Sequence, residues 1–138
     1  VMFMDEEVAQ RGGQAYAKEA KAKGEKHIAA MESDRGVLTP RAVSIGTEPV
    51  RFEKGMKWET FFEPYDLKIV KGGGGVDISP LRKEYPDLVY LGMLPDASRY
   101  FRFHHSGFDT FEQVDRREMQ MGSAAMAALI YLYDKYGL

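Results

Sequence analysis

The chain has 138 residues, 44% of them apolar and 12% aromatic, which is enough for one globular domain with a core and excludes a disordered segment. Its 21 acidic and 19 basic residues give a formal net charge of −2 without long blocks of either sign, which argues against nucleic acid or an anionic membrane as a partner. There is no cysteine, so disulfides and thiolate metal sites are excluded, and His, Asp and Glu remain as metal ligands.

The N-terminal stretch VMFMDEE joins an apolar run to three consecutive carboxylates, Asp5, Glu6 and Glu7. VMFM has the composition of a buried strand. Because it has no leading polar residue or turn, we expect a fragment whose upstream part is missing. Three like charges at the end of a strand repel one another, so they need compensation if they point into a cleft. A metal ion would provide it.

A helix and a second strand are predicted next. Residues 11–23 are rich in strong helix formers and are followed by Gly24, which predicts a surface helix. Residues 27–32, HIAAME, predict a short buried strand that ends at a polar turn containing Asp34. Strand, helix and strand favour a βαβ unit with a parallel pair. Both strands would then deliver acids at their carboxyl ends, where open α/β sheets bind ligands.

The middle of the chain is less regular. Residues 37–55 contain two prolines and two glycines and are expected to be mostly loop. Residues 56–65 predict a short amphipathic helix that uses Met56, Phe61 and Phe62. A short strand over 67–70 should precede a mobile loop of four glycines at 72–75.

The C-terminal third begins with Ser79-Pro80, a helix cap followed by proline, which predicts a short helix towards Glu84. Residues 88–94 predict a strong strand, and residues 95–114 a long loop that carries His104 and His105. A final helix should start with a capping box and pack an apolar stripe on the sheet. The box is Asp115 and Glu118, and the stripe is Met119, Met126, Leu129, Ile130 and Tyr133.

Each candidate site residue has a simple structural explanation when it is taken alone. Adjacent acids at a helix entrance are usually solvated, an acid after a strand is usually a turn residue, and imidazoles in an aromatic loop often only pack. Together, however, these residues place carboxylate oxygens and imidazole at the ends of separate elements. That donor set suits zinc, and a Glu beside a ligand Glu can act as the base of a metallohydrolase.

Four segments, taken in this order, resemble the second half of the catalytic domain of the M28 family zinc peptidases, the aminopeptidase and carboxypeptidase Q-like group. The segments are FMDEEVAQRGGQAYA, HIAAMESDRG, GGGGVDISPL and RYFRFHHSGFDTFEQVD. The likeness covers nearly the whole chain, so residues 1–138 would be the C-terminal portion of a single catalytic domain. It implies an α/β fold that is part of a three-layer αβα domain with a mixed, mainly parallel sheet.

The resemblance also implies roles for individual residues in a site with two zinc ions. Glu6 would be the general base, and Glu7, Asp34 and His105 would be zinc ligands. The residues expected to support the site or bind substrate are Asp77, His104, Asp109 and Thr110. In this mechanism the metals polarise the scissile carbonyl, while Glu6 takes a proton from water and passes it to the leaving amine.

The chain departs from the family pattern in ways that affect activity. A tyrosine donor found in well-studied secreted members corresponds here to Gly74, and the upstream H-x-D ligand and bridging aspartate have no match. We therefore expect this chain alone to bind zinc weakly and to have little or no activity. Exposed sheet edges would favour a homo-oligomer.

The leading hypothesis is a zinc-dependent exopeptidase, with an aminopeptidase favoured over a carboxypeptidase and a peptide as its substrate. One alternative is a noncatalytic α/β binding module with a pocket around GGGGVDISPL. Another is an acyl transferase of the same fold that resembles the glutaminyl cyclases and uses one zinc. No apolar run approaches the roughly 20 residues that a membrane helix needs. The compartment is undecided from composition, and the resemblance favours a secreted or periplasmic protein.

Overall fold

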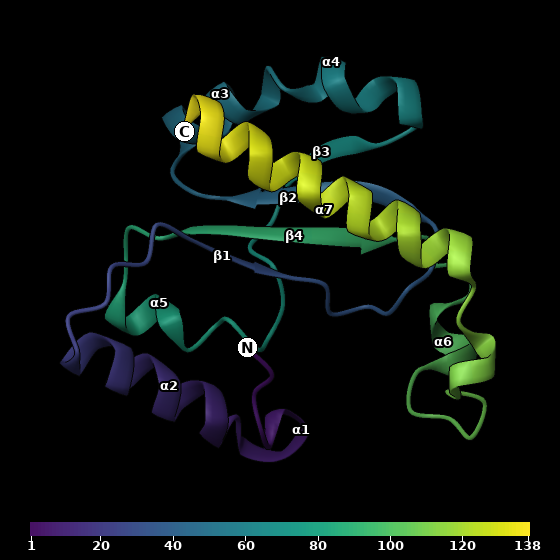
Figure 1. Ribbon diagram of the computed structural model, residues 1–138, viewed down its shortest axis with the longest axis horizontal. Helices are drawn as coiled ribbons and strands as arrows, with labels where there is room; N and C mark the ends of the chain where they lie inside the picture. The colour runs from purple at the N-terminus through teal and green to yellow at the C-terminus, as the bar shows by residue number, and fades with distance from the viewer.

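The computed structural model describes residues 1–138 and has a four-stranded sheet between two helical layers (Figure 1). The strands are β1 (Ala29–Glu32), β2 (Pro40–Gly46), β3 (Lys68–Lys71) and β4 (Val89–Pro95). Their order in the sheet is β1-β4-β2-β3. The pairs β1/β4 and β2/β3 are parallel, and the central pair β2/β4 is antiparallel. This confirms the predicted α/β fold with a mixed, mainly parallel sheet.

The strand register determines which connections meet at the same edge. Ala29 lies opposite Val89 and Glu32 lies opposite Gly92, so β1 and β4 run together. The chain that leaves β1 and the chain that leaves β4 therefore emerge at the same end of the sheet, next to the carboxyl ends of both strands. These two connections carry Asp34 and the two histidines.

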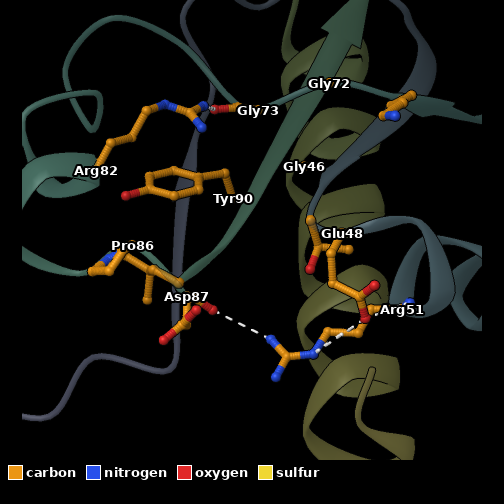
Figure 2. A pocket seen from close by; sticks show the side chains of 12 residues that line it. Gly46, Glu48, Arg51, Gly72, Gly73, Arg82, Pro86, Asp87 and Tyr90 are labelled. Atoms are coloured by element: carbon orange, nitrogen blue, oxygen red, sulfur yellow. Dashed lines mark hydrogen bonds and ion pairs between the residues drawn. The ribbon is translucent and has the colours of Figure 1, made fainter.

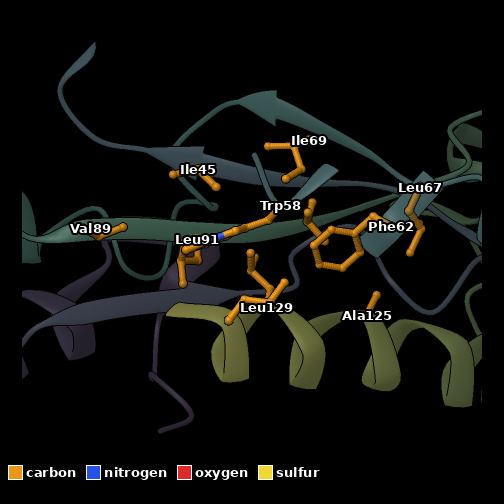
Figure 3. Packing of buried hydrophobic residues seen from close by; sticks show 11 residues of the cluster. Ile45, Trp58, Phe62, Leu67, Ile69, Val89, Leu91, Ala125 and Leu129 are labelled. Atoms are coloured by element: carbon orange, nitrogen blue, oxygen red, sulfur yellow. The ribbon is translucent and has the colours of Figure 1, made fainter. Parts of the chain in front are cut away.

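One face of the sheet is covered by α7 (Arg116–Tyr136), α3 (Pro49–Met56) and α4 (Glu59–Phe62) (Figure 1). Figure 3 shows the core that they form, in which side chains from β2 and β4 meet Trp58, Phe62 and Leu129. Burial of these side chains against the sheet supplies the hydrophobic stabilisation of this layer.

The other face is covered by α2 (Arg11–Ala22) and α5 (Leu81–Glu84) (Figure 1). Their cluster contains Ala17, Ile78, Leu81, Leu88 and Tyr90. The remaining short elements are α1 (Glu6–Ala9), η1 (Glu63–Tyr65), α6 (Tyr100–Phe103) and η2 (Phe111–Gln113). None of the helices is both long and apolar enough to cross a lipid bilayer.

The prediction of a strand at VMFM is wrong. Residues 1–3 have no regular structure, and Val1 and Met2 are 89% and 96% exposed. Met4 accepts a hydrogen bond from the backbone N–H of Gly12 instead of joining a ladder. A strand requires a neighbour for its backbone groups, and this segment has none, so its apolar composition does not decide its structure. The predicted βαβ unit is therefore also wrong, because β1 pairs with β4.

The expectation of a loop over residues 37–55 is wrong for most of that range, which forms β2 and α3. The central strand β2 is covered on both faces, so four consecutive residues are buried and the alternation of a surface strand is absent. Helix α3 starts with Glu48, whose carboxylate accepts the N–H groups of Val50 and Arg51, followed by Pro49 at the first helical position. Glutamate is uncommon at the N-cap position, so the sequence did not reveal where this helix starts.

The single helix expected over residues 56–65 is divided into the end of α3, α4 and η1. Phe62 is buried as expected, but Phe61 is exposed and Trp58 takes its place in the core. The strand at 67–70 appears as β3, one residue later. The strand at 88–94 and the helix at 11–23 are confirmed as β4 and α2.

The final helix starts as predicted, since Asp115 accepts the N–H of Glu118 at 2.8 Å. The side chain of Glu118 does not return to the cap and instead bonds Thr39 and Arg99. The predicted apolar stripe is only partly right. The buried residues of α7 are Gly122, Ala125, Leu129 and Leu132, whereas Met119 and Ile130 are exposed.

Candidate functional site

A cavity of about 510 Å³ lies at the edge where β1 and β4 end. Its walls come from four separate segments: helix α1, the turn after β1, the loop before α5, and the loop that contains α6. Figure 1 shows α6 beyond the arrowhead of β4. Seven of the eight predicted site residues line this cavity, and they are Glu6, Glu7, Asp34, His104, His105, Asp109 and Thr110. The eighth, Asp77, does not line it.

Helix α1 presents Glu6 and Glu7 in its first turn. It is preceded by Asp5 in the left-handed region at φ 68°. Asp5 forms an ion pair with Arg11 at 2.6 Å, and the hydrogen bond from Arg11 lowers the pKa of Asp5. Asp5 therefore has a structural partner, which leaves Glu6 and Glu7 as the carboxylates available at the cavity.

His105 approaches Glu7 across the cavity. Its Nε2 lies 3.3 Å from the Glu7 carboxylate, although the two residues are 98 positions apart. His105 is also in the left-handed region, at φ 51°, which is uncommon for a residue other than glycine and costs on the order of 1–3 kcal/mol. The backbone is strained at the residue that turns its imidazole towards the acids.

His104 is engaged differently. Its Nδ1 lies 3.0 Å from the hydroxyl of Tyr100, and the two rings stack. The His104 ring also stacks on that of His105, with centroids 4.0 Å apart. The two histidines thus have different partners: His104 is held by an aromatic neighbour, and His105 contacts an acid.

The carboxylates around Glu6 create a strongly negative field. Burial raises the pKa of Glu6, and the charges of Glu7, Asp77, Asp34 and Glu32 raise it further. A carboxylate with a raised pKa is a better proton acceptor, and a cation placed among these acids would relieve their repulsion.

The donor set has the chemistry of a zinc site, with carboxylate oxygens and one imidazole. No group of three or more His, Asp or Glu side chains is gathered closely enough to enclose an ion. Asp109 and Thr110 line the cavity but form no hydrogen bond with His105. The residue types suit zinc, but in this structure their side chains lie too far apart to enclose an ion.

Two features in and beside the cavity were not foreseen from the sequence. Glu32, at the end of β1, accepts the backbone N–H groups of Asp77 and Ile78. An apolar wall lies around the acids and consists of Val37, Leu38, Val76, Tyr100, Phe103 and Val114. The signal for Glu32 was a charged residue that ends an apolar strand, where a carboxylate needs local hydrogen-bond donors.

A second hollow of about 470 Å³ lies around the start of the glycine loop (Figure 2). Two of its three basic side chains are already engaged: Arg82 lies over the Tyr90 ring and donates to the carbonyl oxygen of Gly73, and Arg51 donates to that of Asp87. Figure 2 shows these groups facing one another around the hollow. This leaves the cavity at α1 as the better candidate site.

Both the sequence and the fold are similar to M28 peptidases. No family model matches the chain. The chain superimposes on the M28 peptidase precursor from Shewanella amazonensis SB2B with a TM-score of 0.85 and 25% identity, over 99% of this chain and 31% of that one. The fold of this chain is thus shared with part of that peptidase precursor.

Two curated proteins that are similar to this chain in sequence are named carboxypeptidase Q. Carboxypeptidase Q from Bos taurus is 28% identical over 136 residues, and that from Homo sapiens is 28% identical over 137 residues. Each alignment covers 96% of this chain and 28% of the relative. The chain therefore spans little more than a quarter of the curated relatives that it matches.

Proposed function

We propose that this chain carries part of the active site of a zinc-dependent exopeptidase of the M28 kind. The observation that carries the proposal is the meeting of Glu6, Glu7, Asp34 and His105, from three separate segments, around one cavity. The similarity to carboxypeptidase Q and to an M28 peptidase over nearly the whole chain supports the same conclusion. The substrate class is a peptide, and residues 1–138 form the C-terminal portion of the catalytic domain.

Each residue has a separate task in this proposal. Glu7, Asp34 and His105 hold zinc, in a site that contains two ions when complete. Zinc, when bound, polarises the scissile carbonyl and lowers the pKa of water. Glu6 takes the proton from the attacking water and returns it to the leaving amine.

Within this class, the proposal favours an aminopeptidase over a carboxypeptidase. Peptides blocked at one end distinguish the two classes. Hydrolysis that survives an amidated C-terminus and stops with an acetylated N-terminus supports an aminopeptidase, and the reverse pattern supports a carboxypeptidase.

The isolated chain should have little or no activity. A catalytic zinc ion needs about three protein ligands, and two ions need more donors than this cavity offers. The exposed apolar residues Val1, Met2 and Met4 and the open edge of β1 would also favour self-association, which makes a homo-oligomer the expected form. Light scattering and a zinc titration of the 138-residue chain test both statements.

The experiment that tests the function is an assay of the native gene product with aminoacyl-nitroanilides, before and after removal of metal. The proposal expects hydrolysis that is lost on chelation and restored by zinc. A protein that binds peptides without hydrolysing them would instead be a noncatalytic binding module. Cyclisation of N-terminal glutamine with a single zinc would indicate the acyl transferase.

A further inference from the structure

The carboxylate of Glu32 connects the end of β1 to the glycine-rich loop, defined here as residues 72–78. Its two oxygens accept the backbone N–H groups of Asp77 and Ile78, at 3.2 and 3.1 Å. Glu32 stands two residues before Asp34, so the hydrogen bonds lie directly beside the turn that carries this acid. Two bonds to a charged acceptor fix both the distance and the direction of the loop.

The same loop packs on α2, the helix that follows the segment of Glu6 and Glu7. Ile78 is buried in the cluster that contains Ala17 of α2. At the start of α2, a Cβ on Gly13 would lie 3.1 Å from the carbonyl oxygen of Asp77. Because α2 directly follows α1, the loop lies between the turn of Asp34 and the segment of Glu6 and Glu7.

The contact between the loop and the turn is close. A Cβ on Gly75 would lie 2.7 Å from the Cβ of Asp34, which is nearer than side-chain atoms approach one another. The side-chain Oδ1 of Asp77 is buried without a hydrogen-bond partner. The hydrogen bonds that join this part of the loop to β1 are those from the backbone N–H groups of Asp77 and Ile78 to Glu32.

We propose that Glu32 is a positioning residue: by holding the backbone of Asp77 and Ile78, it fixes the separation between the turn of Asp34 and the α1 segment of Glu6 and Glu7. Its importance for catalysis rests on the function proposed above, whereas its anchoring of the loop does not. Glu32 belongs to neither hydrophobic cluster, so its loss should loosen the site and leave the core intact.

The chain contains a matched control for this experiment. Glu48 also accepts two backbone N–H groups with one carboxylate, those of Val50 and Arg51, and it lies outside the cavity of the site. Glu32→Gln and Glu48→Gln remove the same charge and the same kind of hydrogen bond. The two variants of the native gene product are compared by hydrogen exchange, zinc affinity, melting temperature and steady-state kinetics.

In Glu32→Gln, amide exchange in peptides covering residues 76–78 should accelerate at least tenfold. Zinc affinity should fall about tenfold, in the range seen when an outer hydrogen-bond partner of a metal site is lost. Because the substrate pocket is kept, kcat should fall about tenfold while KM changes less than twofold.

In Glu48→Gln, faster exchange should be confined to the start of α3, and zinc affinity and kcat should match the wild type. Glu32→Asp keeps the charge but is one methylene shorter, so it should repeat the exchange result if Glu32→Gln fails to fold.

Unchanged exchange at residues 76–78 in both Glu32 variants would overturn the proposal. Equal losses of zinc affinity in the Glu32 and Glu48 variants would also overturn it, since they would reflect general destabilisation. If the wild-type protein has no peptidase activity, the proposed function fails. The exchange comparison still decides whether Glu32 anchors the loop.

Discussion

The imidazole of His105, in the loop after β4, lies 3.3 Å from the carboxylate of Glu7 in helix α1. If both are zinc ligands, His105→Ala in the native gene product should lower zinc affinity at least about 100-fold, because a direct ligand is lost rather than an outer partner. His104→Ala is the comparison and should cost less zinc affinity, because that ring bonds Tyr100 and stacks on His105 but contacts no acid. Competition with a chelator measures both, and equal losses would contradict the assignment.

Gly75 tests how tightly the glycine loop packs on the turn of Asp34. An added Cβ would collide with the Glu32 carboxylate and lie 2.7 Å from the Asp34 Cβ, so Gly75→Ala must displace Glu32, the turn or the loop and should destabilise the fold by about 1–3 kcal/mol. An added Cβ at Gly107 meets no atom within 4 Å, so Gly107→Ala should be nearly neutral. Denaturant unfolding compares the two. Equal stability of both variants would show that the contact is loose.

Leu129 and the neighbouring Ile130 test the packing of α7. Leu129 is fully buried in the core shown in Figure 3, whereas Ile130 is exposed. Leu129→Ala should cost about 2–5 kcal/mol of unfolding free energy, and Ile130→Ala less than about 1 kcal/mol. Thermal or denaturant unfolding gives both values. A larger loss at Ile130 would restore the stripe expected from the sequence.

Glu118 predicts an acid-sensitive contact between α7 and the loop before α6. Burial works against its charged form, but hydrogen bonds from Thr39 and Arg99 prevail and lower the pKa of Glu118 from its ordinary value of 4.5. A lowered pKa in the folded state stabilises the protein above pH 4.5, and this stabilisation is lost as the pH falls through the folded pKa.

Glu118→Gln should therefore lower the unfolding free energy at pH 7 by about 1–3 kcal/mol and flatten its decline in acid. Denaturant unfolding at several pH values measures both effects. Glu53→Gln provides a comparison on an exposed residue. A variant whose stability follows the same acid decline as the wild type would show that Glu118 is not the group that titrates.

The elements that the sequence predicted well contain their own signals. Helix α2 has helix formers and a glycine stop, α7 has the Asp115 cap, and β4 is a continuous apolar run. The predictions fail where contacts with distant parts of the chain decide the local structure. VMFM has strand composition but no neighbouring strand, and β2 lost its alternation because both of its faces are covered.

The candidate site was predicted from residue types and from a family resemblance, not from local structure. The expected strand before Glu6 is absent, yet Glu6 and Glu7 line the same cavity as Asp34 and His105. The role of Glu32 was not foreseen, because its hydrogen-bond partners lie 45 and 46 residues away on a loop without periodicity.

The central claim is that Glu6 is the base and Glu7 a zinc ligand. It is tested most directly by measuring zinc content after dialysis together with kcat, in Glu6→Gln and Glu7→Ala forms of the native gene product. Glu6→Gln should retain zinc and lose at least about 100-fold in kcat, since an amide cannot accept the proton, whereas Glu7→Ala should lose both zinc and activity. Equal zinc loss in the two variants, or full activity in Glu6→Gln, would contradict the account.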